Sequence, residues 1–165
     1  MRLHGIIATT ILATGFTFHL SVSAQAAETD PLAPGDCSAA GQETRLQLVI
    51  DTVRSAKGNV TVVVYGDKAS DFLAKGKKLV KVRLPAHPGT LKACLTLPKA
   101  GRYAVAAFHD EDNDHHLTRN MIGLPVEGYA FSNNPQALLG LPSYSKVSFT
   151  ARVGNTPMPL HIHYP

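Results

Sequence analysis

Residues 102–109 read RYAVAAFH, and this stretch decides the fold because it is apolar on both faces of an extended chain. Tyr103, Val105 and Ala107 alternate with residues that are also apolar, so neither side of such a strand suits water. A strand of this kind needs cover on both sides, as a central strand of a sheet has. The sequence therefore predicts a sheet built around residues 102–109.

Shorter segments elsewhere alternate between apolar and polar residues, which is typical of strands with one buried face. The predicted strands are 46–50 and 60–64, paired as a hairpin, followed by 80–84, 91–97, 102–109, 144–153 and 156–164. Two segments favour helix: 67–77 for a turn or two, and 136–141 for one turn. About seven short strands with turn residues between them predict an antiparallel β-sandwich of the immunoglobulin-like kind. A small closed β-barrel is the alternative.

The first 27 residues have the pattern of a secretory signal peptide. Arg2 is the only early charge, an apolar run extends over 6–22, and small residues follow it. Cleavage is expected within 24–27, and threonines inside the apolar run weaken the alternative of a retained membrane anchor. We therefore expect a periplasmic or secreted protein whose mature form has no membrane span.

The rest of the chain is expected to form one domain. Residues 28–43 are rich in proline, glycine, alanine and acids without any periodicity, so we expect an extended leader before a single domain at 44–165. The formal net charge is +4, and the lysines and arginines are scattered along the chain. A nucleic-acid partner is not expected, because no basic stripe with interleaved aromatic residues is present.

The sequence contains two cysteines, Cys37 in the leader and Cys94 on the more polar face of the strand predicted at 91–97. Export brings a protein into an oxidising compartment, which favours joining them. Two free or intermolecular thiols are the alternative, since sequence alone does not show whether the two Cα atoms approach each other. We predict a Cys37–Cys94 disulfide that ties the leader to the domain.

Most of the polar chemistry follows the central strand, in residues 109–134, HDEDNDHHLTRNMIGLPVEGYAFSNN. Asp110, Asp112 and Asp114 occupy every second position, as ligands do in calcium-binding loops, and Glu127 can add a further oxygen. The match is partial, because His115 stands where such a loop needs glycine. Two interpretations stay open: a calcium site at Asp110, Asp112, Asp114 and Glu127, and a solvated acidic loop that binds no ion.

Histidines beside these acids offer a second kind of metal site. His109, His115 and His116 are suitable ligands for zinc or copper, and we keep them as an alternative to the calcium site. Near the C-terminus, His161 and His163 alternate with apolar residues, so we expect them on the exposed face of a strand.

A catalytic role is a further alternative. His109, Asp110 and Glu127 can supply acid and base groups, and Ser132 can supply a nucleophile. None of the familiar catalytic motifs surrounds them, and polar residues of this kind more often tie loops down. We therefore predict that the protein has no catalytic residues, with a hydrolase as the alternative.

Two motifs, GRYAVAAFHD at 101–110 and GLPVEGYAFSNN at 123–134, resemble the paired motifs of an exported bacterial family known as domain of unknown function 2141. The resemblance extends over 46–164. It implies an extracytoplasmic β-sandwich similar to prealbumin-like and carboxypeptidase regulatory-like modules, and it implies no established activity. The sequence departs from the family pattern at three positions, where His115 and Ala130 replace glycines and Thr118 replaces an acid.

These observations combine into one functional prediction. We expect an exported, non-enzymatic binding or structural module whose functional surface is the segment 109–134. Its partner is an unidentified protein, glycan or small molecule, and calcium is the only cofactor for which the sequence offers a pattern.

Overall fold

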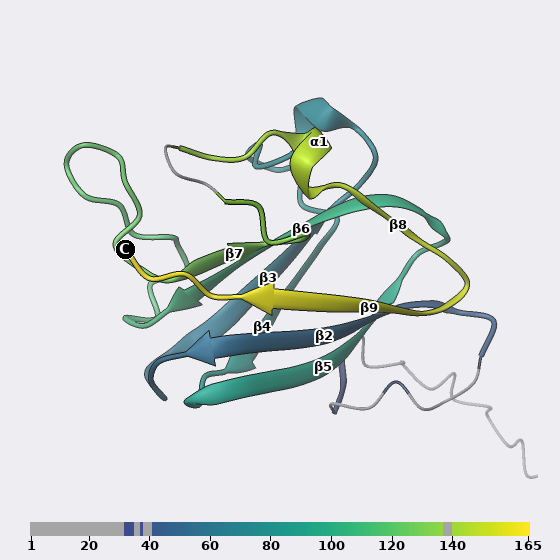
Figure 1. Cartoon of the computed structure of the whole chain (residues 1–165), viewed down its shortest axis with the longest axis horizontal. Coiled ribbons are helices and arrows are strands. Elements are labelled where there is room, and N and C mark those ends of the chain that lie inside the picture. Colours follow the sequence, from purple (N-terminus) through teal and green to yellow (C-terminus); the bar gives the residue numbers. More distant parts are fainter. Residues whose placement is uncertain (1–31, 35–36, 38–40, 137–139) are drawn as a thin grey trace, which may run out of the picture.

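The computed structural model describes residues 32–34, 37, 41–136 and 140–165, which form two packed β-sheets with little helix (Figure 1). The first sheet has the order β1 (Leu32–Pro34), β5 (Gly89–Leu97), β2 (Thr44–Val53) and β9 (Gly154–His161). The second has the order β4 (Val80–Pro85), β3 (Asn59–Tyr65), β6 (Gly101–Asp110) and β7 (Tyr129–Phe131), with β8 (Phe149–Ala151) paired to β6. Neither sheet closes on itself in the described residues, so the predicted β-sandwich is confirmed and the barrel alternative is wrong.

The main core lies between the two sheets and follows the period of two. In β2, Leu46, Leu48 and Ile50 are fully buried, and the residues between them are only half-buried. β3 and β6 supply the facing layer. The first sheet also contributes Met158 and Leu160 of β9 and four residues of β5, Leu91, Ala93, Leu95 and Leu97. Burial of these side chains is the largest favourable contribution to folding, at about 1.5–3 kcal/mol for each large aliphatic residue.

The central strand β6 is covered on both faces, as predicted. Its odd-numbered residues 103, 105 and 107 join the main core. Ala104 and Ala106, on its other face, join a second cluster with Val63 and Phe131. Phe72 and Tyr144 pack over this second cluster. β6 therefore needs no polar face, and it pairs with β3, β7 and β8.

The predicted hairpin of 46–50 with 60–64 is wrong. β2 pairs with β5 and, in parallel, with β9, whereas β3 pairs with β4 and β6 in the other sheet. The connection at 54–58 thus carries the chain from one sheet to the other. Both strands still bury their apolar faces, because the core lies between the sheets.

The structure also shortens or moves the predicted helices. The segment 67–77 contains only the three-residue 3-10 helix η1 (Ala69–Asp71). The strand predicted at 144–153 begins instead with the short helix α1 (Tyr144–Val147), and only β8 is extended. Tyr144 fixes this helix by packing on Phe72 and donating a hydrogen bond to the Gly66 carbonyl at 2.9 Å. The turn predicted at 136–141 falls partly outside the described residues.

The N-terminal predictions are only partly within the described residues. The signal peptide at 1–27 lies outside them, and the leader at 28–43 is represented by β1, Cys37 and residues 41–43. No described helix has the length and apolar character that crossing a membrane requires.

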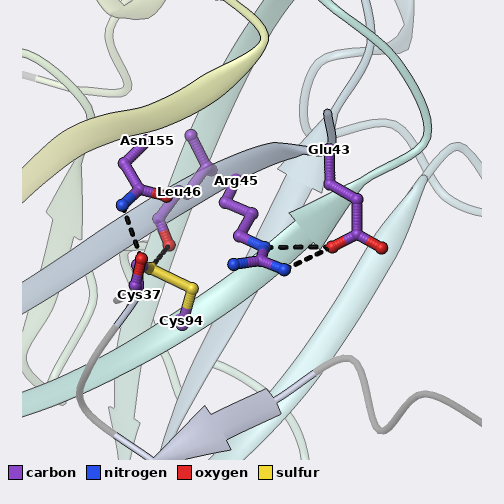
Figure 2. The surroundings of a disulfide bond; sticks show 6 residues. All are labelled: Cys37, Glu43, Arg45, Leu46, Cys94 and Asn155. Carbon is purple, nitrogen blue, oxygen red and sulfur yellow. Dashed lines mark hydrogen bonds and ion pairs between the residues drawn. A yellow bond between two sulfur atoms is a disulfide. The ribbon is translucent and has the colours of Figure 1, made fainter. Parts of the chain in front are cut away.

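The predicted disulfide is confirmed (Figure 2). Cys37 and Cys94 are bonded with their Cα atoms 5.4 Å apart, and both side chains are buried. Asn155 of β9 donates a hydrogen bond of 2.6 Å to the Cys37 carbonyl. The sequence predicts Cys94 on the more polar face of its strand, yet Cys94 is buried, because the bridge to Cys37 shields it from water. The bridge and the hydrogen bond together attach Cys37 to the first sheet.

Candidate cation site

The segment between β6 and β7 projects from one end of the sandwich, beside the C-terminus (Figure 1). It begins directly after Asp110, the last residue of β6, and ends just before Tyr129 of β7. Asp110 and Glu127, near its two ends, are buried, whereas Asp112 and Asp114 are exposed. The loop therefore brings two carboxylates into the protein at the points where it leaves and rejoins the sheet.

Three of the four carboxylates predicted to bind calcium come together. Asp110, Asp112 and Glu127 each offer one carboxylate oxygen, and these oxygens lie within 4.8 Å of one another. Oxygens that share one calcium ion at 2.3–2.6 Å lie at most about 5 Å apart. The group therefore has the dimensions of a calcium site. It is the only group of three or more metal-ligating side chains among the residues that the structure describes.

One carboxylate oxygen of Asp110 accepts hydrogen bonds, and the other has no partner. Its Oδ2 accepts hydrogen bonds from Arg83 at 2.9 Å and from the backbone N–H of His115 at 3.1 Å. Its Oδ1 is buried and has no hydrogen-bond partner. A buried carboxylate oxygen without a partner is destabilising, and a cation bound to it would offset that cost.

Glu127 is held by the backbone of the loop. Its Oε1 accepts from the N–H of Glu111 and its Oε2 from the N–H of Thr118, both at 3.0 Å. Burial raises the pKa of the Glu127 carboxyl, and the charges of Asp112 and Asp110 raise that pKa further. The Thr118 hydroxyl is also buried without a partner and offers one more oxygen on this loop.

Protein cations neutralise this group only in part. Arg83 forms an ion pair with Asp110, but no ion pair reaches Asp112 or Glu127 in the described part of the chain. Neighbouring Glu111 is engaged elsewhere, with Arg54 and Ser55, and its hydrogen bond with Arg54 lowers the pKa of the Glu111 carboxyl. The three carboxylates thus have the oxygen chemistry and the uncompensated charge that suit a divalent cation.

Asp114 is not part of the group. Its carboxylate caps the next turn of the loop, where Oδ1 accepts from the N–H of His116 at 2.7 Å. Asn113 and His115, on either side, have positive φ values of 65° and 72°. These reversals turn the chain between Asp112 and His116, so the every-second-residue pattern ends at Asp112.

The three histidines of the alternative metal site do not form one ligand group. His109 is fully buried, its Nε2 donates to the Lys57 carbonyl at 2.8 Å, and its Nδ1 shares a hydrogen bond of 2.6 Å with the Tyr164 hydroxyl. His115 contacts Arg83 through its ring, and His116 is exposed. Both ring nitrogens of His109 are therefore used inside the protein.

Two other histidines and the predicted nucleophile also have structural partners. His161 and His163 are exposed, as expected, and His161 pairs with Asp51 at 2.5 Å. Ser132 is fully buried, accepts a hydrogen bond from the Val105 N–H at 2.9 Å and donates one of 2.5 Å to the Val147 carbonyl. Ser132 ties β6 to the end of α1.

Sequence reasoning missed two residues that shape the site. Arg83, on β4, reaches Asp110 across the intervening strand β3, and Tyr164 closes over His109 from the C-terminal segment. No local pattern could have indicated either contact, because 27 and 55 positions separate the partners. Gly128 is part of the same arrangement, since a Cβ there would lie 2.3 Å from the Tyr164 ring.

The fold and the loop together define the class, a two-sheet β-sandwich domain with a carboxylate group at the end of its central strand. The chain belongs to the family described as an uncharacterized protein conserved in bacteria, domain of unknown function 2141, whose family model matches residues 48–158. The resemblance seen in the two motifs is thereby confirmed. No curated protein and no solved structure gives a significant match to the chain.

Proposed function

We propose that the protein is an exported, non-enzymatic β-sandwich module whose loop at 110–127 is ordered by a bound calcium ion. One observation carries the proposal: the buried, unpartnered Oδ1 of Asp110, in a group with the carboxylates of Asp112 and Glu127. Export rests on the signal-peptide pattern of the first 27 residues.

An ion at this position would join the two ends of the loop. Asp110 ends β6 and Glu127 lies two residues before β7, so one cation bound by both would close the intervening segment. Three carboxylates in a partly exposed site favour the weak binding of extracellular calcium modules, with a Kd on the order of 0.1–1 mM. Such an affinity is sufficient only where calcium is abundant, which agrees with the proposed export.

The loop also presents an apolar tip that an ordered conformation would expose. Met121 and Ile122 at this tip are largely exposed, and Leu124 and Val126 are about half exposed. Asn120 holds the tip in shape by accepting the N–H groups of Ile122 and Leu124 through its side chain. Exposed apolar groups of this kind mark contact surfaces, so the tip supports a binding role for the segment 109–134.

Calcium is expected to raise the unfolding temperature of the purified mature protein, and Asp112→Ala is expected to abolish the rise. With a Kd of roughly 0.5 mM, about 5 mM calcium would stabilise by about 1.4 kcal/mol, or about 5 °C in a domain of this size. Asp112 is exposed, so its removal leaves the core intact. The measurement is a thermal unfolding curve with chelator and with calcium.

Asp114→Ala provides the matched control for this experiment. Asp114 is an exposed acid of the same loop that also accepts a backbone hydrogen bond, yet it lies outside the carboxylate group. The calcium-dependent rise should persist in this variant. An equal loss in both variants, or no rise in the parent protein, would contradict the proposal.

His115→Gly is expected to strengthen calcium binding severalfold. His115 has a φ of 72°, a left-handed conformation that costs a side-chain-bearing residue about 1–2 kcal/mol and costs glycine almost nothing. Its N–H is one of the donors to Asp110, so a relaxed turn would support the site. The calcium titration of the variant is compared with that of the parent protein. Weaker calcium binding in the variant would show instead that the imidazole takes part.

The alternatives are tested by the same titrations. A zinc or copper protein would show a larger thermal shift with those ions than with calcium, and His116→Ala would reduce it. A hydrolase would require His109 to exchange a proton with a substrate, whereas both of its ring nitrogens face Lys57 and Tyr164 in the interior. The geometry therefore favours the calcium module over both.

A further inference from the structure

A hollow of about 240 Å³ lies on the outer face of the second sheet, away from the main core. β3, β6 and β7 supply part of its lining, and the segment that follows β3 and the loop after β6 supply further residues. The lining residues include the buried apolar side chains Val63, Tyr65, Ala106 and Phe131. The hollow thus adjoins the second apolar cluster.

Every ionisable group around the hollow, apart from the tyrosines, is basic. Lys78, His115, His116 and Arg119 all line it and are all exposed, whereas no aspartate or glutamate is among its lining residues in the described chain. Among the described residues, Lys78 forms no ion pair, and the Arg119 side chain donates only to the Gly123 carbonyl, at 2.9 Å. Apolar walls therefore meet unneutralised positive charge.

Two acids of the loop, Asp110 and Asp114, form hydrogen bonds with other partners. Asp110 accepts from Arg83 and the backbone of His115, and Asp114 accepts from the backbone of His116. They leave the positive charge of Lys78 and Arg119 available to a ligand.

We propose that this hollow binds a small amphipathic anion, with its apolar body against the aromatic residues of the sheet and its anionic head facing Lys78 and Arg119. A volume of about 240 Å³ lies just below the usual range of small-molecule pockets, about 300–1,000 Å³, so the body must be short. Medium-chain carboxylates and alkyl phosphates have this chemistry. Alkylamines of the same length do not, because their head group is positively charged.

The inference goes beyond the calcium proposal and does not depend on it. The floor of the hollow belongs to the sheet, whose strands are held by their own hydrogen bonds. Only one wall, formed by Leu117 and Arg119 with the two histidines, belongs to the loop that carries the carboxylate group. The floor and Lys78 therefore stay in place without calcium, and calcium would strengthen ligand binding by ordering Arg119.

The test compares octanoate, octyl phosphate and octylamine, which share one apolar body and differ in the charge of the head. Each is titrated into the purified mature protein by calorimetry, in chelator and in calcium. We expect saturable binding of one octanoate or octyl phosphate per chain, and binding of octylamine weaker by at least about tenfold. The tighter of the two anions identifies the head group. Equal binding of octylamine, or no saturable binding of either anion, would overturn the inference.

A charge-reversed variant locates the binding. Lys78→Glu combined with Arg119→Glu should weaken octanoate binding by at least about tenfold, because both changes place a like charge beside the head. The control combines Lys92→Glu with Lys99→Glu, two exposed lysines that do not line the hollow. This control has the same net charge change and should bind octanoate as the parent does. An equal loss in both variants would show that net charge alone attracts the anion, and the inference would fail.

The calcium experiment and the octanoate experiment test the two proposals separately. The calcium-dependent unfolding shift is measured without octanoate, and octanoate binding is measured in chelator as well as in calcium. A protein that binds octanoate with the expected charge preference but shows no calcium shift supports the hollow and contradicts the calcium proposal. The reverse result supports calcium and contradicts the hollow.

Discussion

Removal of the Cys37–Cys94 disulfide is expected to lower the free energy of unfolding by about 4 kcal/mol. The two cysteines are 57 positions apart, and in the chain-entropy account a loop of that length restricts the unfolded chain by about this amount. Total stabilities of small domains are about 5–15 kcal/mol, so the bridge would account for a large share. The bridge also holds the Cys37 carbonyl against Asn155, a hydrogen bond that fails if the segment detaches.

The measurement is urea-induced unfolding of the protein with and without reductant, followed by a structural signal of the sheets. The double variant Cys37→Ala/Cys94→Ala should unfold at the lower urea concentration of the reduced protein, and reductant should not change it further. A difference between oxidised and reduced protein below about 1 kcal/mol would contradict the expectation, because the unfolded chain would then be restricted by other means.

The fold was predictable where a local pattern determines burial, and not where strand pairing depends on distant segments. An alternation such as that of Leu46, Leu48 and Ile50 shows which face of a strand is buried. It does not show which strand lies alongside. A hairpin is only the simplest expectation, because it pairs two strands that are consecutive in the chain. In β2 the partners are β5 and β9, and the register of β9 pairs Asp51 with His161, 110 positions later.

The candidate site was also predictable only where a local sequence pattern indicates it. The spacing of Asp110 and Asp112 and the isolated Glu127 sufficed to indicate three members of the carboxylate group. Asp114 left the group because of the left-handed turns on either side of it, which the spacing rule does not take into account. The burial of His109 could have been predicted from the sequence. His109 is separated from Val105 and Ala107 by even numbers of residues, so it lies on the same inward-facing side of β6.

Gly58→Ala is expected to destabilise the protein by about 2–5 kcal/mol and to weaken the calcium response. Gly58 has a φ of +61°, and a Cβ there would lie 1.8 Å from the carbonyl oxygen of Asp110 and 3.0 Å from the Cα of Glu111. The left-handed conformation costs about 1–2 kcal/mol for alanine, and overpacking adds about 1–3 kcal/mol. Since the obstacle is backbone, the end of β6 must move, and Asp110 moves with it.

Gly76→Ala separates the two contributions to this effect. Gly76 has a φ of +74°, close to that of Gly58, but a Cβ there would meet nothing within 4 Å. This control should therefore lose only the conformational part, about 1–2 kcal/mol, and keep the full calcium-dependent rise in unfolding temperature. Unfolding in urea gives the stabilities, and thermal unfolding with calcium gives the response. Equal losses in the two variants would mean that β6 adapts to the added methyl group without cost. A greater loss in Gly58→Ala together with a reduced calcium response would connect the turn at 54–58 directly to the carboxylate group.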